Sequence, residues 1–149
     1  MKTLFEATTA EEVKTRIARL RPDSQRLWGK MTAAQALAHC SLGLEMAVGD
    51  RNPPRMFLGR ILGPMVKSRA LGDTPLRRNS PTAKELIVRD ERNLEGERER
   101  LCGLVDRFST AGPQACTTHP HTFFGPLKPQ EWATLMHKHL DHHLQQFGV

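Results

Sequence analysis

Two histidines near the carboxyl end of the chain, His139 and His143, have the spacing of a metal-binding pair. They fall near the centre of the apolar stripe that residues 132–147 form at helical spacing, whereas His137 and His142 fall well off it. Imidazoles at i and i+4 project from one helix face one turn apart, so both can reach a single ion. The spacing therefore predicts a metal site on the inner face of a helix.

His39 is the candidate third ligand. It lies in the middle of a second predicted helix, on one stripe with Gln35, Leu42 and Met46, so its imidazole could meet the pair across a bundle core. Three neutral imidazoles with a free position are typical of catalytic metal sites. Alternatively, the histidines are core residues hydrogen-bonded to carbonyls or to each other. Adjacent buried imidazoles are difficult to satisfy in an apolar seam without an ion, which favours the metal.

Four segments have the pattern of amphipathic helices, and together they predict an all-α protein. Thr9 with Glu12, and Thr32 with Gln35, match the capping box that opens a helix. Apolar residues recur at helical spacing behind both boxes and in two later segments. The predicted helices span residues 9–21, 32–48, 90–108 and 129–147. Such helices predict a four-helix bundle, and a chain of 149 residues fits one domain, residues 1–149.

Residues 51–82 form a long connection between the second and third predicted helices. Five prolines argue against a long regular element there, so we expect only a short helix over residues 56–62. A connection of this length usually crosses a bundle or covers a site. The short apolar run 85–88 is either extended or the lead-in to the third helix.

Charge is concentrated in the same connection. Between positions 51 and 80 the chain has seven arginines and lysines and one acidic residue, Asp73, so the excess of six positive charges in this segment equals the net charge of +6. The excess could attract an anionic substrate or a nucleic acid, but a solvated connecting segment is the favoured interpretation. Aromatic residues make up 5% of the chain and no DNA-binding motif is recognisable, so we do not expect a nucleic-acid partner.

The composition is that of a globular protein, with 38% hydrophobic and 26% charged residues. No run approaches the ~20 apolar residues of a spanning helix, and the amino terminus lacks the apolar stretch of a secretory signal. We therefore expect a cytoplasmic protein with no membrane partner. Cys40, Cys102 and Cys116 are odd in number and widely spaced, which predicts reduced, buried thiols.

Residues 28–40, 123–127 and 132–148 together resemble the DinB-like (DinB/YfiT) superfamily, in an uncharacterised branch. The resemblance implies a four-helix bundle with a long crossover and a divalent ion held by one histidine of the second helix and a His-x-x-x-His of the last. In this sequence those are His39, His139 and His143. Some relatives are transferases or isomerases that use bacillithiol, mycothiol or glutathione, and many have no known reaction.

The sequence therefore predicts a divalent-metal-binding protein, with a metal-dependent thiol S-transferase as the favoured activity. Zinc or nickel is the preferred ion, although imidazole ligands also suit iron and copper. Arg55, Arg60, Arg77 or Arg78 would hold the carboxylates of an anionic low-molecular-weight thiol. A metal-assisted hydrolase and a non-catalytic metal-binding or stress-response module remain open. A homodimer is expected, from the two apolar sides of helix 32–48 and from the resemblance.

Two further groups have both a structural and a chemical interpretation. His119 and His121 could shuttle protons at the mouth of the site, but a packed loop stiffened by proline is favoured. Glu97 and Arg98 interrupt the apolar stripe of the third helix and could support the site. We expect them instead to lie at the rim of the bundle with their charged groups in water.

Overall fold

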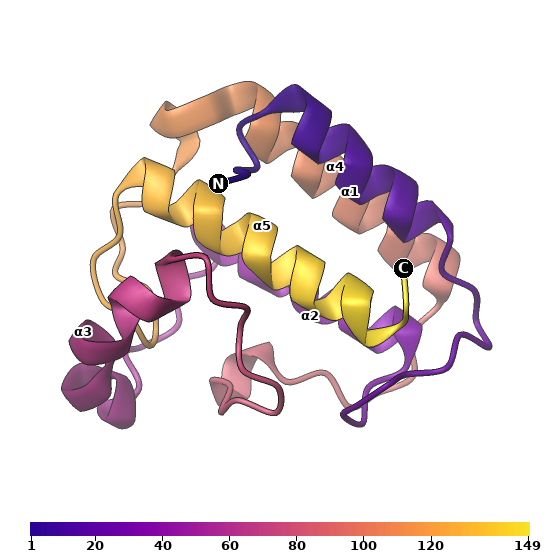
Figure 1. Cartoon of the computed structure of the whole chain (residues 1–149), viewed down its shortest axis with the longest axis horizontal. Helices are drawn as coiled ribbons and strands as arrows, with labels where there is room; N and C mark the ends of the chain where they lie inside the picture. Colours follow the sequence, from indigo (N-terminus) through magenta and orange to yellow (C-terminus); the bar gives the residue numbers. More distant parts are fainter.

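The computed structural model describes residues 1–149 and contains five α-helices, two short 3₁₀ helices and no strand. The α-helices are α1 (Ala7–Ala18), α2 (Ala33–Ala47), α3 (Phe57–Leu71), α4 (Leu94–Ala111) and α5 (Pro129–Gln146), and the 3₁₀ helices are η1 (Lys84–Leu86) and η2 (Gly112–Ala115) (Figure 1). The predicted all-α class is confirmed. No helix combines the length and apolar character needed to cross a membrane.

Four of the helices, α1, α2, α4 and α5, pack around the hydrophobic core, while α3 lies at one end of the molecule and contacts α5 (Figure 1). The helix α2 is the most buried, because it packs against both α4 and α5. Its alanines, glycine and serine let the neighbouring backbones approach closely. Both apolar sides of α2 are therefore covered within the chain, so they no longer argue for the homodimer, which stays a prediction.

The two predicted capping boxes have different outcomes. Thr32 and Gln35 do form one: the Thr32 hydroxyl accepts the backbone N–H of Gln35 at 3.2 Å, and the Gln35 side chain accepts that of Thr32 at 2.9 Å. The box at Thr9 is wrong, because α1 begins two residues earlier, after Glu6. The Thr9 hydroxyl is buried and donates to the Glu6 carboxylate instead.

The prediction of only a short helix over residues 56–62 is also wrong, since α3 runs for 15 residues with Pro64 inside it. Proline removes one helical hydrogen bond, to the carbonyl of Arg60. Both residues are exposed, so that carbonyl is open to water and the cost of the missing bond is reduced. On the other face of α3, Gly59 and Gly63 have no side chain, so the helix lies directly on the loop before α5 at Phe123.

The helix α4 begins at Leu94 rather than at Asp90. Asn93 caps it, because its side-chain oxygen accepts the backbone N–H of Gly96 at 2.9 Å. The apolar run at 85–88 is separate from α4 and belongs to η1 and the extended residues that follow it.

Glu97 does not lie at a solvated rim, as we expected, but is buried within α4. Its carboxylate pairs with Arg92 at 3.1 Å and with Arg100 at 3.3 Å, and Arg100 also pairs with Glu45 of α2. Buried carboxylates need such partners to offset the loss of hydration. This ion-pair network links α2 to α4 and includes no histidine.

Candidate metal centre

The three predicted ligands lie together between α2 and α5. Each offers a ring nitrogen, and these three atoms lie within 4.8 Å of one another. The ring centroids are 4.8 Å apart for His39 and His139, 4.9 Å for His39 and His143, and 4.8 Å for His139 and His143. His39 is buried, and the other two are partly exposed. The cluster is therefore nearly equilateral, at the edge of the core.

A backbone carbonyl fixes the proton of His39. The Nδ1 atom of His39 lies 2.7 Å from the carbonyl oxygen of Leu86 in η1. A carbonyl can only accept, so Nδ1 carries the hydrogen and Nε2 carries the lone pair. Histidine ligands of metal ions typically have such a partner behind the ring, which fixes the tautomer and the ring orientation.

A side-chain amide fixes the proton of His143 in the same way. The Gln146 amide nitrogen donates to the carbonyl of Trp28 at 2.7 Å, which turns its oxygen toward Nδ1 of His143, 2.9 Å away. Because that oxygen only accepts, His143 also carries its hydrogen on Nδ1 and its lone pair on Nε2. His39 and His143 therefore both present Nε2 as an acceptor.

His139 forms the third corner of the cluster, with its Nε2 atom 2.9 Å from Nε2 of His39. Since Nε2 of His39 is an acceptor, His139 donates a proton to it in the metal-free protein. Moving that proton to Nδ1 would leave three Nε2 lone pairs in the cluster. Gly43 gives the ring its room, because a Cβ at that position would lie 3.1 Å from Nδ1 of His139.

All three ligands are held in the neutral form. Burial lowers the pKa of His143 to about 3. Burial and the neighbouring histidines hold the pKa of His139 well below its usual range, and burial lowers the pKa of His39 against the opposing effect of the Leu86 carbonyl. Neutral imidazole is the form that coordinates metal ions, so the donor set fits a divalent transition metal.

The predicted sorting of the helix α5 histidines agrees with the structure. His137 and His142 are outside the three-histidine cluster and are about half-buried. The ring of His142 nevertheless lies 5.0 Å from that of His143 and 5.5 Å from that of Trp28, so it forms the wall beside the cluster.

In the loop before α5, His121 is part of a packed loop, which is the interpretation that we favoured over a proton shuttle. Its Nδ1 atom accepts the backbone N–H groups of Phe123 and Phe124 at 3.0 and 3.1 Å, and its ring stacks on Phe124. Burial, reinforced by the charge of Arg55, lowers the pKa of His121 to about 4. His119 contacts the carbonyl of Pro120 at 3.0 Å. Neither histidine belongs to the metal-ligand cluster.

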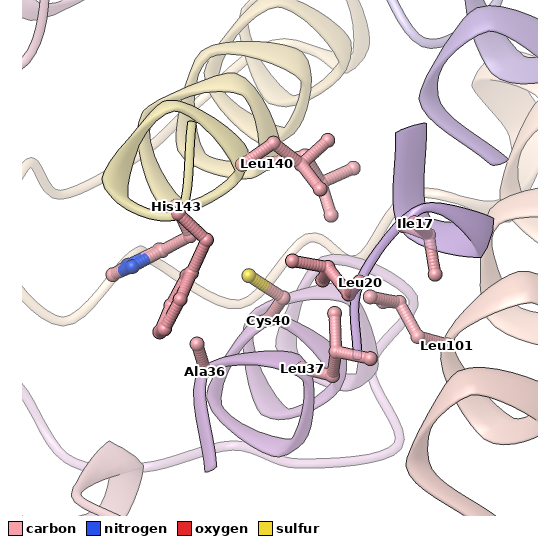
Figure 2. Close-up of a pocket in the computed structure, with 10 residues that line it drawn as sticks. Ile17, Leu20, Ala36, Leu37, Cys40, Leu101, Leu140 and His143 are labelled. Atoms are coloured by element: carbon pink, nitrogen blue, oxygen red, sulfur yellow. The ribbon is translucent and has the colours of Figure 1, made fainter. Parts of the chain in front are cut away.

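One wall of the cluster faces a small apolar cavity, shown in Figure 2, in which the Cys40 sulfur points into the space between α2 and α5. Its volume is about 10 Å³, which is near the minimum for one water. Complete burial raises the pKa of the Cys40 thiol well above its ordinary value. The cavity is therefore too small for a substrate, and Cys40 is unsuited to act as a nucleophile.

A larger groove of about 380 Å³ lies beside His142, between α5 and residues 72–78 of the long connection 51–82, which we call the crossover. Lys138 lines it and donates to the carbonyls of Gly72 and Thr74. Arg78 lines it with its guanidinium carbon 3.9 Å from the centre of the Trp28 ring. The crossover thus covers the side of α5 next to the three histidines.

Sequence reasoning missed the residues that support the ligands. Gly43 follows His39 by four residues and Gln146 follows His143 by three, so each lies on its ligand's helix face. A glycine and a side-chain amide at these spacings could have been recognised from the sequence as possible supports of the ligands. No sequence signal indicated the Leu86 carbonyl, because every residue has a backbone carbonyl.

A helical bundle with three histidines converging from two helices defines a class of candidate mononuclear metal-binding proteins. The chain belongs to the DUF1569 family, a protein family of unknown function whose model matches residues 2–148. No curated protein and no solved structure matches the chain. The family carries no assigned activity, so function has to be argued from the site.

Proposed function

We propose that the protein binds one divalent transition metal ion through Nε2 of His39, His139 and His143. The observation that supports this proposal is that hydrogen bonds hold the ring proton of two of the three histidines, His39 and His143, on Nδ1. The Leu86 carbonyl and the Gln146 amide oxygen both hold Nδ1–H, so the remaining lone pairs face the centre of the cluster. Zinc and nickel suit such an imidazole set.

We further propose that the protein is a metal-dependent thiol S-transferase of the DinB-like superfamily. An ion at this site would lower the pKa of a bound thiol and so supply a thiolate nucleophile at neutral pH. The three ligands are all neutral, which leaves the charge of the ion uncompensated and favours an anionic fourth ligand. A small-molecule thiol therefore suits the donor set.

The groove beside His142 is lined by none of the three candidate ligands, but its cations make it the place we propose for the carboxylates of an anionic thiol. Of the four arginines that we expected to hold its carboxylates, only Arg78 lines the groove. Arg55 packs on Gly125 and donates to the carbonyl of Gly59, and Arg60 is exposed on α3. Arg78 is therefore the residue we assign to the carboxylate, with the Trp28 ring holding its guanidinium in place.

Metal content tests the first proposal. His39→Ala and His143→Ala should each purify with strongly reduced metal, because two imidazoles bind a divalent ion much more weakly than three. His142→Ala is the matched control on the same helix and should keep its metal. Elemental analysis measures the content, and circular dichroism confirms that each variant is folded. Wild-type metal content in all three variants would disprove the site.

Thiol binding tests the second proposal. We expect the zinc- or nickel-loaded protein to bind glutathione, bacillithiol or mycothiol in calorimetric titration, and the metal-free protein to bind none. Arg78→Ala should weaken binding several-fold, with a gentle salt dependence because only one ion pair is lost. Metal binding without a response to any thiol would instead favour the non-catalytic metal-binding module.

A further inference from the structure

The outward face of α3 is apolar, although it has no partner in the chain. Phe57 is 78% exposed, Met65 75% and Ile61 56%, and these residues follow one another at four-residue spacing. Leu58, Leu62 and Val66 continue the patch and are each more than one-third exposed. Together they expose a few hundred Å² of apolar surface, a size that marks an interaction site on a globular protein.

The orientation of α3 is set by its opposite face. A Cβ at Gly59 would lie 2.6 Å from the Phe123 backbone, and one at Gly63 would lie 2.1 Å from the Phe123 carbonyl oxygen. Any larger residue at either position would collide with that loop. Only the glycine face can therefore pack against the body of the protein, and the apolar face must point away from it.

The charge around this face has a single sign. By helical position Arg69 follows Met65 by four residues and so ends the apolar row, while Arg60 lies to one side of it. Both arginines are exposed and form no ion pair in the structure. Helix α3 contains no acidic residue at all. Arg77 adds a further exposed, unpaired cation in the residues that follow.

We propose that α3 lies on the surface of an anionic phospholipid membrane, with Phe57, Ile61 and Met65 among the acyl chains. Arg60, beside the apolar row, and Arg69, at its end, reach the lipid phosphates, as the long cationic side chains of interfacial helices do. A helix of this length rests in the plane of the interface and does not span it. The proposal revises our expectation of no membrane partner, which followed only from the lack of a spanning segment.

A second copy of the chain fits this face less well. A symmetric pair formed through it would bury an area at or below the ~1,200 Å² from which stable interfaces begin. It would also bring together two copies of a region whose unpaired cations include Arg60, Arg69 and Arg77. Like charges repel across such an interface, whereas anionic lipids attract them.

Vesicle sedimentation of the full-length protein tests the proposal. We expect binding to vesicles of phosphatidylcholine mixed with phosphatidylglycerol, weaker binding to phosphatidylcholine alone, and a fall in binding as salt is raised. The double variant Phe57→Ser/Met65→Ser should lower the partition coefficient by about tenfold or more, because two large apolar side chains no longer enter the membrane. Both side chains are exposed, so the fold should be unaffected.

Two controls separate the apolar and the charged contributions. Leu27→Ser removes an apolar side chain that is 67% exposed but far from α3 in sequence, and it should bind as the wild type does. Arg60→Gln/Arg69→Gln should weaken binding to the anionic vesicles by roughly tenfold or more and leave binding to phosphatidylcholine unchanged.

Two results would overturn the proposal. One is the absence of binding to anionic vesicles at low salt. The other is a mass in light scattering twice the expected 16.8 kDa that Phe57→Ser returns to the monomer value, because the face would then join two copies of the chain. Neither result depends on metal content, so the test is independent of the proposed metal site.

Discussion

The substitution Gly43→Ala should weaken metal binding without destabilising the metal-free protein. A Cβ at this position would lie 3.1 Å from Nδ1 and 3.3 Å from Cε1 of His139. Ordinary contacts between such atoms are roughly 3.5–4.0 Å, so the ring would have to move by a few tenths of an ångström. In the metal-free protein, the free-energy cost of moving the ring offsets a stabilisation of about 1 kcal/mol, because alanine has a higher helix propensity than glycine. With metal bound, the ligand is held in place, and we expect the dissociation constant to rise about tenfold.

Gly103→Ala is the matched control, because it replaces a glycine inside α4 where a Cβ meets nothing within 4 Å. Urea unfolding in the presence of a chelator should show it more stable than the wild type by about 1 kcal/mol, and calorimetric titration with zinc or nickel should show unchanged affinity. Gly43→Ala should unfold within about 1 kcal/mol of the wild type and bind more weakly. If Gly43→Ala binds metal as tightly as Gly103→Ala, the inferred crowding of His139 is wrong.

Three further outcomes are expected. Gln146→Leu should reduce metal affinity by roughly 10–100-fold in calorimetric titration, because Nδ1 of His143 loses its acceptor; unchanged affinity would show that the tautomer is fixed otherwise. Metal removal by a chelator should lower the melting temperature of the wild type, since an ion at one hundred times its dissociation constant stabilises the native state by about 2.7 kcal/mol, and a melting temperature indifferent to metal would argue against binding. The pKa of His121 is lowered from 6.5 to about 4, so below pH 6.5 the unfolded chain binds a proton that the folded chain does not, and stability falls by up to about 3 kcal/mol between pH 6.5 and 4. Urea unfolding at pH 7 and pH 5 should show a smaller loss for His121→Asn, which keeps an acceptor but does not titrate, and an equal loss would place the acid sensitivity elsewhere.

The helical period carried most of the successful predictions. On α5 it places His139 and His143 on the core side and His142 off it, as the structure does. On α2, the same period turns His39 inward at the level of that pair. The direction of a side chain in a helix follows directly from its sequence position. A site built on two regular helices can therefore be predicted when it can be predicted that the two helices pack together.

The errors fall where tertiary contacts override a local signal. Pro64 argued against a long helix, yet α3 forms because its glycines pack on the Phe123 loop and its proline faces water. Thr9 has the sequence of a cap, yet it is buried inside α1. Glu97 looked like a rim residue, but arginines from both sides neutralise it in the interior. The local pattern does not show the Phe123 loop or the burial of Thr9 and Glu97, although the partners of these two buried residues lie within five residues of them.

The supports of the candidate site come from three separate parts of the chain. The Leu86 carbonyl belongs to the segment after the crossover, Gln146 is held by the Trp28 carbonyl before α2, and Gly43 belongs to α2 itself. The orientation of the ligand rings therefore depends on the packing of the whole bundle and of the crossover against it. A metal ion bound by these rings would stabilise that packing in turn, because binding to the native state alone adds to its free energy of unfolding. The chain on both sides of residue 82 thus shapes the candidate site: residues 72–78 of the crossover cover the side of α5 next to the three histidines, and η1, which follows the crossover, positions His39.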